Sequence, residues 1–322
     1  MNIKEYREKV IDCLKNLPEL KDAVIDSEDV VKSNDTTLNA ISIRKDKESS
    51  LGVNLYVEEY FRLNMDPENA AEDILRIYSD NINNQTADEI SSLIDTFKDF
   101  NKLKDKITIR VFNKNRNSNF IEDCPYLVFG DLVIMFYVNV TDCATAKINN
   151  SMMKEWDVPL NDLISTGFEN MRKLYPLKIN GIFNMLLEMH HMSKEEVDNY
   201  SEALDEADKN MFVISNNYDA YGAFYIADKF SLNQIYNTVK SDFIIIPSSV
   251  HELIVVPFPM GPGATVASDD KSEAMKALNE MVGEVNRTTL HDSDVLSDHV
   301  YFYNGTEQRL YDDKDHVIPF VY

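Results

Sequence analysis

Two short apolar runs that lie close together restrict the fold of this chain most strongly. Residues 243–246 and 253–256 are rich in β-branched side chains, and a proline follows each run. Runs this short that end at a proline are typical of buried strands. Between them lies the sequence Pro-Ser-Ser-Val-His-Glu, which carries four polar or ionisable side chains. We therefore predict two buried strands that are joined by a polar corner.

Helical and strand patterns alternate along the rest of the chain. The spacing of apolar residues predicts helices over 3–16, 51–63, 67–79, 87–103, 159–174, 181–191, 232–240 and 268–285. Alternation or apolar runs predict strands at 107–112, 131–140, 147–150, 211–215 and 222–226, with hairpins over 22–45 and 300–311. We expect an α+β fold in which helices surround a mixed, mainly antiparallel sheet.

The pattern also suggests how the chain is divided. Residues 1–104 are predicted to be mostly helical with one β-hairpin, and residues 105–322 form a sheet-rich α+β region. A single integrated domain is the alternative, because no Gly/Ser-rich linker separates the two regions.

The charge limits the choice of partners. Fifty-five acidic and 32 basic residues give a formal net charge of −23, and Lys and Arg do not cluster in any run. Such a chain is repelled by nucleic-acid phosphates and by anionic membrane surfaces. We therefore expect no direct nucleic-acid or membrane binding, and a protein partner that meets an acidic surface. Residues 188–209 are especially acidic and are one candidate for this surface.

The cysteines and the N-terminus indicate the compartment. Cys13, Cys124 and Cys143 are odd in number and widely spaced, which disfavours both a disulfide framework and a structural zinc site. The N-terminus has the pattern of a charged amphipathic helix, and no stretch approaches the roughly 18 apolar residues that span a membrane. We expect a soluble cytoplasmic protein with reduced thiols.

Several segments resemble one protein family in the expected order. They are residues 38–44, 54–60, 71–78, 148–151, Trp156, 243–257, 284–286 and 296–301. With these segments the chain resembles an uncharacterised family of proteins from gut-dwelling Firmicutes, known only as a domain of unknown function (DUF5688). The resemblance implies a single-module cytoplasmic protein of the kind found among mobile-element cargo. It implies no activity and no catalytic residue, and the glycine-rich stretch 260–264 departs from the family pattern.

The polar corner is the densest candidate for a reactive site. Ser248 or Ser249, His251 and Glu252 could act as nucleophile, base and orienting carboxylate. However, triad members usually come from separate elements, and the chain has no Gly-x-Ser-x-Gly elbow. The structural alternative is a capped turn, in which a serine accepts from the backbone N–H three residues on and Glu252 completes a capping box.

Two further groups of residues could bind a metal. Glu188-x-x-His191 resembles half of a di-iron site, but no second Glu-x-x-His occurs in the chain. The loop that contains His291, Asp294 and His299 could supply carboxylate and imidazole ligands to Zn²⁺ or Mn²⁺. A solvated helix face and ordinary turn residues explain these groups better than a metal site does, so we predict neither a metal nor another cofactor.

These observations favour a non-catalytic interaction or regulatory protein that acts on a protein partner through an acidic surface. A nucleic-acid-mimicking inhibitor is one concrete version of this hypothesis. The alternative is an enzyme, either a hydrolase that uses residues 248–252 or a metal-dependent enzyme that uses His190, His191 or the 291–299 loop. An enzyme predicts that Ser249 and His251 line a pocket together with polar groups from other elements.

Overall fold

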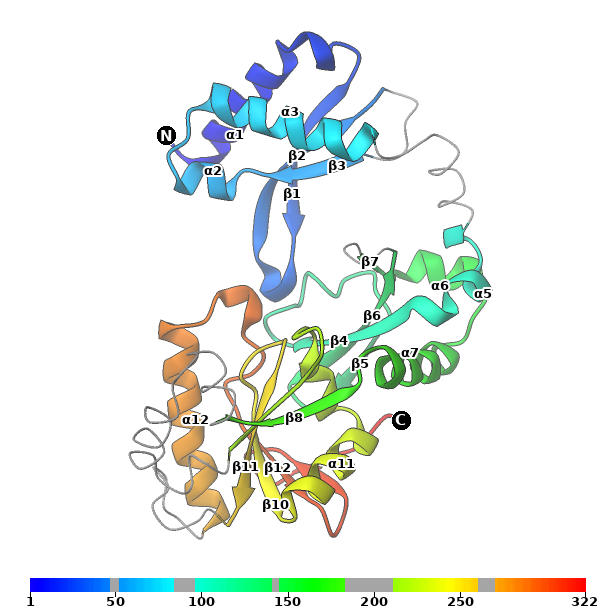
Figure 1. Ribbon diagram of the computed structural model, residues 1–322, viewed down its shortest axis with the longest axis vertical. Helices are drawn as coiled ribbons and strands as arrows, with labels where there is room; N and C mark the ends of the chain where they lie inside the picture. The colour runs from blue at the N-terminus through cyan, green and yellow to red at the C-terminus, as the bar shows by residue number, and fades with distance from the viewer. Residues whose placement is uncertain (47–51, 84–95, 141–144, 183–210, 260–269) are drawn as a thin grey trace, which may run out of the picture. The chain divides into compact units, whose positions relative to one another are not determined.

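The computed structural model describes residues 1–46, 52–83, 96–140, 145–182, 211–259 and 270–322 (Figure 1). The chain divides into two compact units, Met1–Phe97 and Lys98–Tyr322. Helices and sheets occur in both units, so the predicted α+β class is confirmed. All strand pairings among the described residues are antiparallel. None of the helices in these ranges is both long and apolar enough to cross a membrane.

The first unit packs helices on one face of a three-stranded sheet of order β1-β2-β3. Its elements are α1 (Ile3–Lys15), β1 (Val24–Val31), β2 (Thr37–Arg44), β3 (Gly52–Tyr56), α2 (Glu58–Arg62) and α3 (Pro67–Asn83). The core joins apolar residues of α1 and α3 to alternate residues of the sheet. Its fully or almost fully buried members include Tyr6, Val10, Leu14, Ile25, Ile41, Ile43 and Ile74.

Two local predictions for this unit are confirmed, and one is wrong. The hairpin turns at Asn34 and Asp35, which both have positive φ, as these short polar residues tolerate. Asp66 accepts from the backbone N–H of Glu68 at 3.0 Å, and α3 begins at Pro67. The helix predicted over 51–63 is wrong in its first half, because 52–56 pairs with β2 as strand β3. The helix predicted over 87–103 lies mostly outside the described residues.

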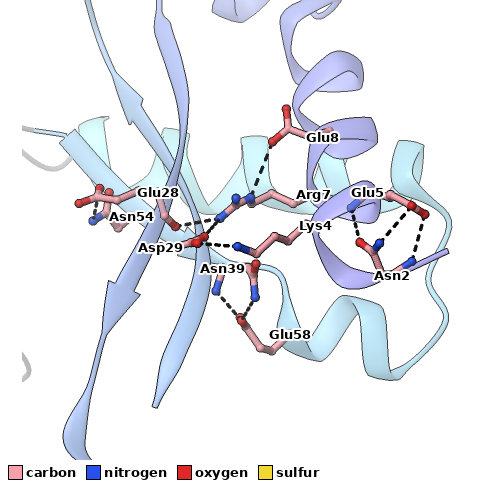
Figure 2. A network of polar contacts seen from close by, with 10 residues as sticks. All are labelled: Asn2, Lys4, Glu5, Arg7, Glu8, Glu28, Asp29, Asn39, Asn54 and Glu58. Atoms are coloured by element: carbon pink, nitrogen blue, oxygen red, sulfur yellow. Dashed lines mark hydrogen bonds and ion pairs between the residues drawn. The ribbon is translucent and has the colours of Figure 1, made fainter. Parts of the chain in front are cut away.

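The buried side chain of Arg7 links α1 to β1, an edge strand of this sheet (Figure 2). The side chain of Arg7 is only 7% exposed and lies 2.7 Å from Asp29 Oδ1. It also donates to the carbonyl of Glu28 at 3.0 Å, while Lys4 lies 2.8 Å from the same Asp29 carboxylate. One carboxylate of β1 therefore neutralises two cations of α1.

The second unit contains two antiparallel sheets. In the four-stranded sheet, β6 (Leu132–Asn139) pairs with β4 (Ile107–Asn113), β5 (Tyr126–Phe129) and β7 (Thr145–Lys147). The seven-stranded sheet has the order β14 (Val317–Ile318), β13 (Arg309–Tyr311), β12 (Tyr301–Asn304), β10 (Asp242–Ile246), β11 (Leu253–Phe258), β9 (Phe212–Asn216) and β8 (Leu177–Gly181). The two runs that bracket the polar corner are thus neighbouring strands, β10 and β11, as predicted.

Helices pack against both sheets of this unit. They are α5 (Phe100–Leu103), α6 (Asn150–Trp156), α7 (Leu160–Leu174), α11 (Lys229–Val239) and α12 (Lys271–Thr288), with 3-10 helices η3 (Lys104–Lys106), η4 (Gly222–Ile226) and η5 (Asp292–Asp294). Ala274, Met275, Leu278 and Val282 of α12 are buried, whereas Met281 is 43% exposed. The strand predicted at 222–226 is wrong. These residues form η4 and are buried throughout, so their unbroken apolar sequence resembles that of a buried strand. The helix predicted over 181–191 begins where β8 ends, and most of it lies outside the described residues.

A buried carboxylate connects α7 to α11. Asp228 has no exposed side-chain surface, and it caps α11 by accepting from the backbone N–H of Ser231 at 3.1 Å. Arg172, in the last turn of α7, donates to both carboxylate oxygens of Asp228 at 2.6 to 3.1 Å. Removal of one partner from a buried pair leaves the other charge without compensation.

We expect Asp228→Ala to lower the free energy of unfolding by about 3–5 kcal/mol, because it removes both the cap and the partner of Arg172. Urea unfolding of the full chain measures this change. Asp228→Asn retains the capping oxygen and should lose about 1 kcal/mol less. The matched control is Asp162→Ala, an exposed acid in the first turn of α7, with a change within about 0.5 kcal/mol. Equal effects of Asp228→Ala and Asp162→Ala would contradict the structural role of the pair.

Candidate functional site

The polar corner between β10 and β11 is closed by its own side chains. The hydroxyl of Ser248 donates to Glu252 Oε1 at 3.2 Å. The Oγ of Ser249 accepts from the backbone N–H of His251 at 3.0 Å, and its backbone N–H donates to the carbonyl of Glu252 at 3.2 Å. The turn differs from the predicted capping box, because the serine accepts from the residue two positions on and Glu252 accepts through its backbone.

His251 is arranged as a packing residue rather than as the base of a serine. Its Nδ1 is buried without a hydrogen-bond partner, and its ring centroid lies 5.8 Å from that of Tyr221. Among the described residues, the hydrogen bonds of the Ser248 and Ser249 hydroxyls go to Glu252 and to a backbone N–H, not to this imidazole. The corner therefore lacks the serine–histidine bond on which triad chemistry depends.

The corner also supports the turn that follows β9. The carbonyl of His251 accepts from the backbone N–H of Gly222 at 2.8 Å. A Cβ atom at Gly222 would lie 2.4 Å from this carbonyl oxygen, so no other residue fits there without movement of the backbone. Within the turn, the fully buried Asn216 accepts from the N–H of Tyr218 at 2.9 Å and donates to the carbonyl of Ala220 at 2.7 Å.

This turn holds Tyr221 in an unusual backbone conformation. Its φ of 59° and ψ of 22° lie in the left-handed region, which bulky side chains rarely adopt. Strain of this kind costs about 1–3 kcal/mol and persists where the surroundings determine the conformation, most often at functional sites. Here the surroundings are the Gly222–His251 bond, the His251 ring and the Arg110 guanidinium.

Tyr221 lines a cleft of about 810 Å³ in the second unit. The ends of η3, β6, β7 and α7 and the turn after β9 contribute its walls, which include Lys106, Asn139, Thr145, Tyr175, Tyr218 and Tyr221. Asn139 donates to the hydroxyl of Tyr175 at 3.2 Å and accepts from Thr108 at 3.3 Å, which fixes the orientation of its amide. Clefts of this size that combine aromatic walls with a few oriented polar groups are typical of small-molecule sites.

A cation lies directly beside this cleft. The guanidinium of Arg110, on β4, lies between the rings of Tyr137 and Tyr221, at 4.0 and 3.9 Å from their centroids. It donates to the Thr145 hydroxyl at 2.7 Å through Nη2, while its Nε is buried and has no hydrogen-bond partner within the described residues. Burial raises the pKa of Tyr137, against the opposing effect of Arg110, so this phenol stays neutral. Within the described ranges Arg110 forms no ion pair with a carboxylate.

The candidate metal ligands of the 291–299 loop do not converge. The imidazole of His299 lies 3.0 Å from Asp313, whereas His291 is exposed and precedes η5. The carbonyl of Asp294 accepts from the N–H of Val250 at 3.1 Å, so this loop also braces the corner. Over the described part of the chain, no group of three or more His, Cys, Asp or Glu side chains could hold a metal ion. Glu188, His190 and His191 lie outside the described residues.

Two segments that carry the family resemblance are in contact. Asn286 donates to the carbonyl of Ser297 at 3.0 Å and to Asp298 Oδ1 at 2.8 Å. Arg116 donates to the second oxygen of Asp298 at 3.3 Å. Burial favours the neutral form of Asp298, but the bonds from Asn286 and Arg116 outweigh it and lower the carboxyl pKa. Hydrogen bonds within the fold thus account for the polar side chains of Asn286 and Asp298 in these two segments.

The sequence reasoning missed the cleft. The signal that could have found it is a pair of tyrosines, Tyr218 and Tyr221, within a polar turn-forming stretch that precedes Gly222. Arg110 gave no such signal, because an arginine within a strand is ordinary.

Fold and cleft together define an α+β protein with a preformed, tyrosine-lined cleft. The model of a family of unknown function (DUF5688) matches residues 3–305, and the chain belongs to this family. No curated protein matches the chain, and no solved structure does.

We expect Gly222→Ala to destabilise the protein by about 3 kcal/mol, because the new Cβ overlaps the carbonyl of His251 and the backbone must move. Urea unfolding checks this value. The control is Gly283→Ala in α12, where a Cβ meets only the end of the Arg287 side chain at 3.3 Å. This control should be neutral or stabilising by up to about 1 kcal/mol. A neutral Gly222→Ala would mean that the corner does not hold the turn.

The lowered pKa of Asp298 gives a pH dependence of defined sign. A carboxyl whose pKa is lower in the folded state stabilises the fold above its unfolded pKa, and this contribution disappears as the pH falls towards the folded value. Asp298→Asn should therefore be less stable than the parent at neutral pH, and the difference should shrink below about pH 4. Urea unfolding of both proteins between pH 7 and pH 3 measures it. A difference that stays constant with pH would exclude the ionised carboxylate as its source.

Proposed function

We propose that this protein is a non-catalytic interaction or regulatory protein that acts on a basic protein partner through an acidic surface. The observation that supports it most directly is a group of carboxylates around Cys13 in the first unit. The same proposal places the protein in the cytoplasm and excludes direct binding to nucleic acid. Cys13 and Cys124 are free thiols, in keeping with that compartment.

The acidic group consists of Asp12 on α1 together with Asp66 and Glu68 at the start of α3. All three side chains are exposed. Burial is the largest cause that raises the pKa of the Cys13 thiol, and the charges of Glu68, Asp66 and Asp12 raise it further. Asp12 precedes Cys13 on α1, and Asp66 and Glu68 stand at the start of α3, which shares a core with α1. None of them forms an ion pair within the described residues.

Several cations of the first unit are paired with other acids. Lys4 and Arg7 are paired with Asp29, as Figure 2 shows, and Arg62 and Arg76 lie beside acids on their own helices. Unpaired carboxylates on a surface attract basic partners and repel acidic ones, with an effect that salt screens. The net charge of −23 extends this preference over the whole chain.

The hydrolase alternative has less support from the described geometry. Ser249 uses its hydroxyl to hold the backbone N–H of His251, and the residue that lines the cleft is Tyr221 rather than either of these two. An interaction protein needs no aligned nucleophile and base, so this geometry fits the interaction proposal.

The test is affinity capture from bacterial lysate with the immobilised full chain. We expect a captured basic protein to be released when salt rises from about 50 mM to about 500 mM, because the Debye length falls severalfold. The triple variant Asp12→Asn, Asp66→Asn, Glu68→Gln should lose most of this capture. Asn retains the capping oxygen at position 66, so α3 should keep its start.

The matched control neutralises three exposed acids of the second unit, with Glu155→Gln, Glu280→Gln and Glu284→Gln. This control changes the net charge by the same amount as the first triple variant, and it should still capture the partner. Capture that resists salt, or that both triple variants lose to the same degree, would contradict a specific acidic surface around Cys13.

A further inference from the structure

The tyrosine-lined cleft lies in the second unit, and its properties do not depend on the acidic surface of the first unit. A cation lies beside this cleft. In a chain of net charge −23, Arg110 has no carboxylate partner among the described residues. The Nε of its guanidinium is buried without a partner in these ranges, so the group gains from an anion supplied from outside.

The guanidinium of Arg110 reaches the cleft through Thr145. The rings of Tyr137 and Tyr221 lie with their centroids 4.0 and 3.9 Å from the guanidinium carbon. Its Nη2 donates to the Thr145 hydroxyl at a solvent-exposed position. Thr145 itself lines the cleft. Edge N–H groups in a fixed plane are suited to the oxygens of a carboxylate or a phosphate.

The cleft also offers a platform for a planar group. Tyr218 is 68% exposed, and the described turn fixes its backbone through the bond from its N–H to Asn216. Its ring lies edge-on to Tyr175, with centroids 5.5 Å apart and an interplanar angle of 66°. A large exposed aromatic side chain on a fixed turn can stack on a flat ligand with little loss of conformational entropy.

The remaining polar groups fit such a ligand. Asn139 presents an amide whose orientation is fixed by Tyr175 and Thr108. Lys106 supplies a second cation to the lining, and Asp105 a single carboxylate. Among the described residues, these groups and Arg110 give two positive charges and one negative charge.

We propose that this cleft binds a small planar molecule that carries an anionic group, with the ring on Tyr218 and the anion at the edge of Arg110. The anion is a carboxylate or a phosphate, since both present oxygens in the geometry that the guanidinium accepts. The strained Tyr221 is a positioning residue, because it holds the guanidinium in place from one side.

Isothermal titration of the full chain tests this with two matched pairs of probes. Adenosine monophosphate and adenosine differ by a phosphate, and indole-3-acetate and indole-3-acetamide differ by the charge of a carboxylate. We expect at least one anion to bind with a dissociation constant of about 1 mM or tighter, and its neutral counterpart about tenfold or more weakly. Binding of only the nucleotide identifies a phosphate, and binding of only the indole acid identifies a carboxylate.

Two substitutions locate the site. Tyr218→Ala removes an exposed ring and should weaken binding of that anion about fivefold or more. Arg110→Lys retains the charge but loses the planar edge, and it should weaken binding about tenfold. The controls are Tyr126→Ala, a 40% exposed tyrosine on β5, and Arg287→Lys, an exposed arginine on α12. Both controls should bind like the parent.

Three results would overturn the proposal: no binding by either anion, equal binding of an anion and its neutral counterpart, or equal weakening by Tyr218→Ala and Tyr126→Ala. Urea unfolding of each variant shows whether its fold is intact. If Arg110→Lys is unstable, Tyr218→Ala decides the question alone. Loss of ligand binding leaves the capture experiment on the first unit unaffected, so the two proposals can fail separately.

Discussion

The close backbone approach of Gly222 to His251 is the constraint on which the candidate site depends. Because a Cβ cannot fit 2.4 Å from a carbonyl oxygen, the two segments meet only through glycine. Their contact closes the turn after β9 against the corner between β10 and β11. The position of Tyr221 follows from this contact, and Tyr221 in turn covers one face of Arg110. The hydrogen bonds from Gly222 N–H to His251 and from Ala223 N–H to Val250 thus position a wall of the cleft.

The strands explain why this contact is precise. The pairing of β11 with both β9 and β10 places the turn after β9 beside the corner that precedes β11. Antiparallel register is determined by which side chains face the core, and Phe243, Ile244, Leu253 and Val255 are fully buried. Phe243 and Ile244 are consecutive, so both faces of β10 are buried, and a shift of the register by one residue would exchange the side chains that pack on the two faces. The apolar runs therefore do more than form a core, because they also align the two polar loops that meet at Gly222.

The sequence predicted much of this framework and little of the site. The strands around the corner, the terminal hairpin and the start of α3 were predicted from local residue patterns, and these predictions are confirmed. The strand at 52–56 and the 3-10 helix at 222–226 were misassigned, because a short apolar segment is compatible with more than one backbone conformation. Tertiary contacts determine the backbone conformation of such segments, and the local sequence does not indicate these contacts.

The candidate site shows the same limit in its chemistry. Serine, histidine and glutamate that are neighbours in sequence mostly reach their own backbone, as Ser249 does when it accepts from the N–H of His251. Groups that can act together on a ligand come from separate elements, here β4, β6, β7 and the turn after β9. Density of polar residues along the chain therefore indicated a turn, and that turn is the support of the cleft rather than its lining. The polar corner, residues 247–252, therefore contributes to the candidate site indirectly, because it holds Tyr221 in place.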